Sequence, residues 1–304
     1  MSMNNSISVI LPNYNGRSLL FDNIPSIITS LNTAKCEYEI IVVDDCSSDD
    51  SISMLQHHFP EVIIIQNEIN QGFSATCNRG VFAAKLPLVC ICSTDVTVEN
   101  DYFLNALPHF KNPNLFALKG NIINYTSTID NIDNIEKASL LYYTRGFLRF
   151  NDRVEYVPGT FTGKLNGQFV LLGCVFICDR EKMLHLKGFD EIFSPFYWED
   201  SDLAIRALRS GYNLVYEPNC VVYHQTSSTI SNYRSYTKRR LVSMRNKFLF
   251  SWRHLDDPKL WINHILYTFV SLLTRWVILD WKYYAAFFNA LLRLKKFTVR
   301  YKYT

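Results

Sequence analysis

The chain has 304 residues, of which 48% are hydrophobic, including 21 Phe and 18 Tyr. This length accommodates one large domain or two smaller ones with a substantial core, and the apolar content excludes a disordered chain. The formal net charge of +3 is unevenly distributed, because residues 227–304 carry 15 of the 31 Lys and Arg but only 3 of the 28 Asp and Glu. We therefore predict an acidic domain over residues 1–226, followed by a basic region over residues 227–304 that meets an anionic surface.

The cysteines and the N-terminus both predict a cytoplasmic protein. The eight cysteines include no C-x-x-C pair, which is typical of reduced, buried cysteines rather than of a zinc site. The first residues, MSMNNSISVILPNYNG, lack a basic segment and contain only a short apolar run, unlike a secretory signal peptide.

Strand and helix patterns alternate in the first third of the chain. The strand-like apolar runs cover residues 7–12, 39–43, 62–65 and 88–92, and helical patterns cover residues 17–31 and 72–84. Strands that are apolar on both faces are typical of parallel strands covered by helices. The alternation therefore predicts an α/β fold with right-handed crossovers.

Polar residues follow each of these four strands, at Asn13–Gly16, Asp44–Ser47, Asn67–Gly72 and Ser93–Val96. Ligands bind at the carboxyl ends of parallel strands, so we predict a polar ligand site at this edge of the sheet. The chain has neither a Walker motif nor a G-x-G-x-x-G loop, which argues against a P-loop kinase or a nicotinamide dehydrogenase. Carboxylates at strand ends favour instead a divalent cation that bridges carboxylate and diphosphate, while another carboxylate acts as a base.

The stretch FYWEDSDLAIRALRSG, residues 196–211, places Glu199, Asp200 and Asp202 directly after two aromatics. One interpretation is the acidic first turn of a helix, where carboxylates are stabilised by the helix dipole. The other is the acidic pair of an active site. Both hold if the start of the helix directs Asp200 into a cleft, whereas Asp202 is expected to be first-turn charge only.

The basic region is also rich in aromatics, as in YRSYTKRRLVSMRNKFLFSWRH over residues 233–254. Its longest uncharged apolar segment, LWINHILYTFVSLLT over residues 260–274, is shorter than the ~20 residues of a spanning helix. Nearby Lys and Arg favour helices that lie in the membrane interface, with a spanning helix and simple packing on the body as alternatives. No nucleic-acid-binding motif accompanies the basic stretch, so no nucleic-acid partner is predicted.

Seven fragments occur in one order over residues 8–224: SVILPNYNG, EIIVVDDCSSDDS, NQGFSATCNRG, STDV, LLGCVFI, GFDEIFSPFYWEDSDLAIRALRSGY and VVYH. Together they closely resemble the family 2 glycosyltransferases, which are inverting, nucleotide-sugar-dependent enzymes, and in particular the rhamnosyltransferase-like branch that builds bacterial surface polysaccharides. The resemblance implies the GT-A fold, with a mostly parallel central sheet flanked by helices. A helical C-terminal extension would follow it here.

The resemblance also implies where the donor binds. The matched residues are Pro12, Tyr14, Asp45, Gly72, Asn78 and Gly173. The first two match residues that line the nucleotide pocket, and Asp45 matches the carboxylate that accepts a hydrogen bond from the imide of the base. Gly72 and Asn78 match the segment that borders base and ribose, and Gly173 matches a glycine beside the donor sugar.

The same resemblance implies the metal and the base. Asp95 matches the last acid of a D-x-D-type motif of which only one carboxylate remains here, and His224 matches a late histidine that helps to bind the metal. Diphosphate oxygens and water would complete the shell of a Mg²⁺ or Mn²⁺ ion. Asp200 matches the general base, with Glu199 as its neighbour.

The expected reaction moves a sugar from a UDP-, dTDP- or GDP-sugar to a hydroxyl of a saccharide acceptor. We expect this acceptor to be lipid-linked and held against Tyr197 and Trp198. The protein would lie peripherally at the inner face of the cell membrane. A nucleotidyltransferase is a weaker alternative, because PNYNGR is a poor match for its glycine-rich basic loop. A further alternative is a non-catalytic, membrane-docked partner protein that binds nucleotide or saccharide, in which Asp200 is dispensable.

Overall fold

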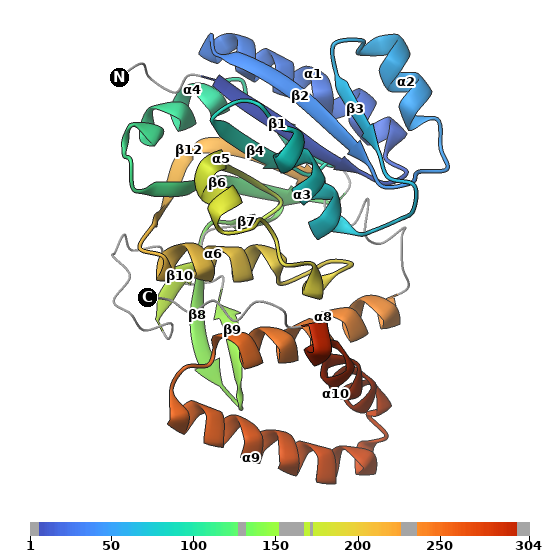
Figure 1. Ribbon diagram of the computed structural model, residues 1–304, viewed down its shortest axis with the longest axis vertical. Coiled ribbons are helices and arrows are strands. Elements are labelled where there is room, and N and C mark those ends of the chain that lie inside the picture. Colours follow the sequence, from blue (N-terminus) through green and yellow to red (C-terminus); the bar gives the residue numbers. More distant parts are fainter. Residues whose placement is uncertain (1–5, 127–131, 152–166, 171–172, 226–235, 297–304) are drawn as a thin grey trace.

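The protein is built around one large sheet with helices on both sides (Figure 1). The computed structural model describes residues 6–126, 132–151, 167–170, 173–225 and 236–296. Across the sheet the strands are β3 (Ile63–Gln66), β2 (Glu37–Asp44), β1 (Ser6–Asn13), β4 (Leu88–Cys92), β11 (Val175–Asp179), β6 (Leu115–Tyr125), β12 (Asn213–Gln225) and β5 (Val96–Val98). A further strand, β7 (Ile132–Glu136), pairs with β6.

Strand direction differs between the two halves of this sheet. β3, β2, β1 and β4 run parallel, as their apolar patterns predict. Beyond β4 the sheet is mixed, since β11 is antiparallel to both β4 and β6, whereas β12 runs parallel to β6. The α/β fold of the N-terminal part is therefore confirmed, and its four parallel strands end at one edge.

Each face of the sheet has its own hydrophobic core. On one face the core is formed with α1 (Arg17–Ala34), α2 (Ser51–His58) and α4 (Tyr102–Ala106). On the other face it is formed with α3 (Phe73–Ala83), α5 (Arg180–His185) and α6 (Glu199–Arg209). Successive β1 residues contribute to opposite cores, Val9 to the first and Ile10 to the second, as expected for a strand buried on both faces.

A small second sheet and three helices lie beyond α6 (Figure 1). The sheet has the order β10 (Gln168–Val170), β8 (Ser139–Thr144), β9 (Phe147–Asn151), and the helices are α8 (Tyr236–His254), α9 (Pro258–Thr274) and α10 (Trp281–Arg293). Phe248, Leu249 and Phe250 of α8 are buried in the same core as α3 and α6. The predicted boundary near residue 226 falls outside the described residues, and no helix within them is long and apolar enough to cross a membrane.

Candidate active site

A pocket opens where β1 and β2 end. It is lined by Pro12, Asn13, Tyr14, Asp45, Asn70, Gly72, Phe73, Thr76, Pro195 and Phe196. Four of the six residues assigned to the donor site by resemblance are in this lining. The structure thus gathers them from three segments that are far apart in sequence.

Asp45 organises one wall of this pocket. Its carboxylate accepts hydrogen bonds from the Asn67 side chain and from the backbone N–H groups of Gln71 and Gly72, each at 2.8 Å. The neighbouring Asp44 accepts instead from the Asn13 side chain at 2.8 Å, within a buried link between β1 and β2. Asp44 is therefore structural, whereas Asp45 faces the pocket.

Gly72 and Asn78 tie α3 to the segment that leads to α6. Gly72 has a φ of +88°, and a Cβ there would lie 2.9 Å from the Cα of Pro195, so only glycine fits this wall. The carboxamide of Asn78 accepts from Phe189 N at 2.8 Å and donates to Phe189 O at 2.9 Å. Asn78 is not among the residues that line the pocket, so its place beside base and ribose stays a prediction.

A second group of polar residues lies where β5 and β12 meet. His224 Nε2 is 3.5 Å from Asp95 Oδ1, and His224 Nδ1 is 2.7 Å from Asn124 Oδ1. Burial lowers the pKa of His224, but Cys174 and Asp95 outweigh it and raise the pKa to about 11. A divalent cation at Nε2 requires the neutral imidazole, so metal binding there would be coupled to loss of a proton.

The chemistry of this pair fits a divalent cation. A carboxylate and an imidazole fixed through its other nitrogen are typical ligands, and Asn124 supplies that fixation. Among the described residues, no group of three or more His, Cys, Asp and Glu could hold a metal on its own. The pair would therefore need ligand oxygens from a substrate, such as those of a diphosphate.

The sequence did not predict the ion pair beside these residues, of which one partner is buried. Lys119 on β6 is fully buried, and its Nζ donates to Glu136 Oε1 of β7 at 2.6 Å. A Cβ on Gly173 would lie 3.1 Å from that oxygen and 3.3 Å from Nζ. The absence of a side chain at Gly173 therefore leaves space beside the ion pair. His224 also acts on Glu136, because its charge lowers the pKa of this carboxyl. The ion pair therefore belongs to the same polar group as His224.

The acidic pair begins α6 on an unusual turn. Tyr197 and Trp198 have φ angles of +74° and +78°, which are costly for bulky residues and concentrate at functional sites. Trp198, not Asp200, is the N-cap residue of α6. Asn246 of α8 donates to the backbone oxygen of Tyr197 at 2.9 Å, so the C-terminal region helps to hold this turn.

Asp200 and Glu199 both have raised pKa values, and burial is the main cause for each. Burial raises the pKa of Asp200, and the charge of Glu136 adds to this, while Lys119 and the N–H of Ser201 lower it. Burial and the neighbouring Asp200 raise the pKa of Glu199 to about 8. Glu199 Oε2 is buried with no donor among the described residues, which favours the neutral carboxyl.

The charges of Glu136 and Lys119 thus act on Asp200, whose role as the base stays a prediction. Asp200 Oδ1 also accepts from Ser201 N at 2.6 Å, within the first turn of α6. The two aromatic residues predicted to hold the acceptor, Tyr197 and Trp198, lie in different surroundings. Trp198 packs on Phe250 with ring centroids 4.9 Å apart, whereas Tyr197 lines a separate, basic pocket.

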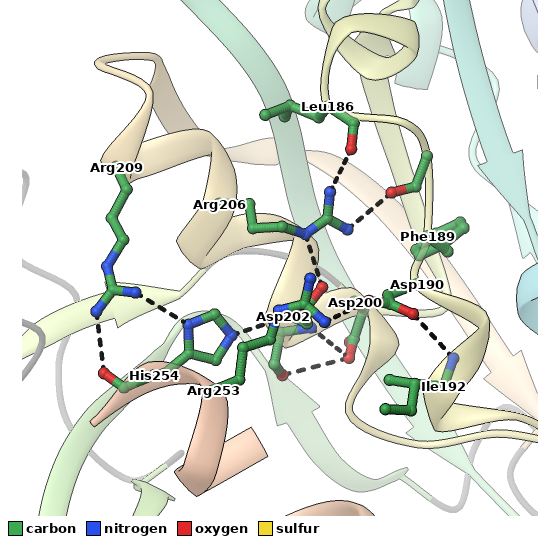
Figure 2. Close-up of polar contacts among 12 residues, drawn as sticks. Leu186, Phe189, Asp190, Ile192, Asp200, Asp202, Arg206, Arg209, Arg253 and His254 are labelled. Carbon is green, nitrogen blue, oxygen red and sulfur yellow. Dashed lines mark hydrogen bonds and ion pairs between the residues drawn. The ribbon is translucent and has the colours of Figure 1, made fainter. Parts of the chain in front are cut away.

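The expectation that Asp202 is only first-turn charge is wrong. Asp202 is fully buried and accepts from Arg206 Nε at 2.7 Å, Arg253 Nε at 3.0 Å and His254 Nε2 at 2.9 Å (Figure 2). Residues two apart on a helix point in different directions, so Asp200 and Asp202 serve different surroundings. Asp202 anchors α6 to α8.

Glu136 offers a test of the electrostatics around Asp200. In Glu136→Gln we expect the acidic limb of the pH–rate profile to move about one unit toward lower pH, because a carboxylate that raises the pKa of Asp200 is lost and the charge of Lys119 is left uncompensated. The control is Glu181→Gln on α5. An unchanged acidic limb of the pH–rate profile in Glu136→Gln would show that Glu136 does not influence the group that titrates in the reaction.

Comparison with known proteins identifies the family. The model described as Glycosyl transferase family 2 matches residues 8–167. The pre-mycofactocin glycosyltransferase of Mycobacterium tuberculosis is 23% identical over 226 residues, which cover 72% of this chain and 42% of that protein. The poly(ribitol-phosphate) beta-glucosyltransferase of Bacillus spizizenii is 33% identical over 102 residues, 32% of this chain and 16% of that protein. The matched part is less than half the length of either relative.

Solved structures agree on the fold. S. aureus TarS 1–349 in complex with UDP-GlcNAc superposes with a TM-score of 0.60 at 15% identity, covering 95% of this chain and 81% of that one. The mannosyltransferase PcManGT from Pyrobaculum calidifontis, in complex with GDP-Man and Mn²⁺, gives 0.57 at 17% identity, covering 96% and 76%. The chain belongs to glycosyl transferase family 2 and has the GT-A fold of its nucleotide-sugar-dependent transferases.

Proposed function

We propose that the protein is an inverting glycosyltransferase that moves a sugar from a nucleoside-diphosphate donor to a hydroxyl of a lipid-linked saccharide, in the synthesis of bacterial surface polysaccharide. The observation that supports this proposal is the approach of His224 Nε2 to Asp95 Oδ1, 3.5 Å apart, beside the ion pair of Lys119 and Glu136. The charges of this ion pair also act on Asp200. The pocket where β1 and β2 end is the one that we assign to base and ribose. The names of two similar proteins, one acting on poly(ribitol-phosphate) and one crystallised with UDP-GlcNAc, support the substrate classes.

In this mechanism Asp200 accepts the proton of the acceptor hydroxyl as that oxygen attacks the anomeric carbon. The bond from the anomeric carbon to the diphosphate oxygen breaks, its electron pair leaves with the nucleoside diphosphate, and the configuration inverts. Burial and the neighbouring Asp200 raise the pKa of Glu199, which favours a neutral carboxyl beside the attacking oxygen. A divalent cation bound by Asp95 and His224 would neutralise charge on the diphosphate.

A donor screen tests this function. Purified protein is incubated with Mg²⁺ or Mn²⁺ and a panel of UDP-, dTDP- and GDP-sugars, and released nucleoside diphosphate is measured. We expect release from one donor class, and release about 10²–10⁴-fold slower from Asp200→Asn with the same donor. Release from no donor, with nucleotide binding retained, would favour the non-catalytic partner protein instead.

We also propose that the C-terminal helices rest on a membrane surface. The outer side of α9 is apolar and exposed at Ile262, Ile265, Leu266, Phe269, Val270 and Leu273. Its inner side carries buried polar residues, and His264 accepts from Trp252 Nε1 at 2.8 Å there. This is the reverse of a helix that packs on a protein core and leaves a polar side to water. The apolar stripe continues through Trp276 and Leu279, the latter 82% exposed, beside many Lys and Arg.

Substitutions on the outer side of α9 test the membrane contact. Leu266→Asp and Phe269→Asp are each expected to weaken sedimentation with phosphatidylglycerol-containing vesicles by about tenfold, because each removes one apolar side chain from the interface. Phe82→Asp, an equally exposed Phe on α3, is the control. Equal sedimentation of all four proteins would exclude this face as the contact.

A further inference from the structure

A basic pocket lies on α8, close to the start of α6. Its lining residues are Tyr197, Tyr236, Arg239, Arg240, Ser243, Met244 and Lys247. Three of these seven side chains are cationic, and no lining residue among the described ones is acidic. The pocket is separate from the one at the ends of β1 and β2, with which it shares no residue.

The part of the chain that the structure describes compensates the positive charges of this pocket poorly. Burial, and then the charges of Arg149 and Arg275, lower the pKa of Lys247 to about 7. The Nε atoms of Arg149 and Arg239 are buried without a hydrogen-bond acceptor among the described residues. Like charges gathered at a partly buried site raise its free energy, and a bound anion removes that cost.

Tyr197 connects this pocket to the acidic pair. Arg239 acts on the Tyr197 hydroxyl through its charge and a hydrogen bond. Tyr197 lies three residues before Asp200 and is held by Asn246 of α8. A molecule bound in the pocket would therefore extend toward the proposed base.

We propose that this pocket binds a phosphate or diphosphate group of the acceptor, so that the acceptor reaches Asp200 from the α8 side. The inference rests on the proposed function, since it takes Asp200 as the base. Two arginines, a lysine, a serine and two tyrosines are typical ligands of phosphate oxygens, and arginine donates to them in pairs. The donor diphosphate has its own place at Asp95 and His224. The pocket also lies on the helix that leads into α9, which suits an acceptor whose phosphate joins a saccharide to a membrane lipid.

Calorimetric titration of the full chain with inorganic pyrophosphate, in EDTA and without nucleotide, tests the pocket directly. EDTA removes divalent cations and so suppresses binding at the donor site. Arg240→Gln and Lys247→Gln are each expected to bind about tenfold more weakly than wild type, through loss of a charge-assisted hydrogen bond. Asp95→Asn and Lys238→Gln, an exposed lysine on the same helix, should bind as wild type does.

Three results would overturn the proposal: no binding by wild type, weaker binding only in Asp95→Asn, or equal binding by every variant. A fourth would point to bilayer headgroups, namely pocket variants that lose sedimentation with phosphatidylglycerol-containing vesicles but keep pyrophosphate affinity. Thermal melting of Arg240→Gln and Lys247→Gln controls for folding. The donor screen is independent, so a protein that binds pyrophosphate here but releases no nucleotide overturns the proposed reaction and not the anion site.

Discussion

Replacing Asp200 with asparagine is expected to lower the turnover number for sugar transfer by about 10²–10⁴-fold, the range that a positioned general base contributes. Asparagine has the same shape and can still accept the hydrogen bond from Ser201 N, so α6 should start as before. It cannot accept the proton of the acceptor hydroxyl. The loss should therefore appear in turnover, with little change in the KM for the donor.

The measurement is the rate of nucleoside diphosphate release at saturating donor and acceptor, together with the melting temperature. Since no part of the β1 and β2 pocket changes, nucleotide affinity should match that of wild type. A variant with wild-type turnover would show that Asp200 is not the base, and the acidic pair would then be only the first turn of a helix.

Glu199→Gln is the matched control, one residue away. Burial and Asp200 raise the pKa of Glu199 to about 8, so glutamine reproduces the neutral carboxyl that prevails at neutral pH. We expect a loss of less than about tenfold, far below that of a general base. If Glu199→Gln abolished transfer while Asp200→Asn kept it, the roles of the two carboxyls would be exchanged.

The sequence predicts well what depends on local pattern. β1, β2 and β4 are short apolar runs, and the rule that parallel strands end at one edge brings Tyr14, Asp45 and Gly72 together. Pro12 follows only from the resemblance to the family. Reasoning from local pattern fails beyond β4. There β11, β6 and β12 pair in both directions across long sequence separations, and no periodicity in the chain encodes that order.

The residues that sequence reasoning missed are those whose role depends on such distant pairing. Lys119 is a lone charge in the apolar strand FALKGNII, a signal that it has a buried partner, but nothing in the sequence indicates Glu136 on β7. Asp202 has the spacing of an ordinary i,i+4 pair with Arg206. The signal that Asp202 is buried lies in its other partners, Arg253 and His254, which are some fifty residues later in the chain.

Asp202→Asn is expected to lower the free energy of unfolding by about 3–5 kcal/mol, the usual cost of removing one partner from a buried ion pair. Arg206 and Arg253 would keep their charges with no carboxylate at hydrogen-bond distance in this position (Figure 2). Urea unfolding at neutral pH measures the loss. Asp256→Asn is the control, because Asp256 pairs with Arg209 but is 57% exposed, and should cost less than about 1 kcal/mol.

The pH dependence of this loss has a definite sign. Arg206 and Arg253 overcome the effect of burial and hold the pKa of Asp202 well below its usual value of 3.8. A depressed carboxyl pKa stabilises the fold fully above the unfolded value, and that stabilisation declines as the pH falls below it. The difference between wild type and Asp202→Asn should therefore be constant near neutral pH and shrink below about pH 4. A difference that grows on acidification would contradict an ionised Asp202.

Variants of Asp202 and Asp200, on one short helix, are expected to affect different properties: Asp202→Asn the stability of the fold, and Asp200→Asn the reaction. Arg253 and His254 belong to α8, whose Asn246 holds the backbone of Tyr197, so losing the Asp202 ion pairs loosens the turn that begins α6. Cooling should therefore restore transfer in Asp202→Asn, since the folded population recovers, whereas Asp200→Asn should stay far slower than wild type at every temperature. Activity of Asp202→Asn that stays low in fully folded protein would mean that Asp202 acts on the reaction itself and not only on the docking of α6.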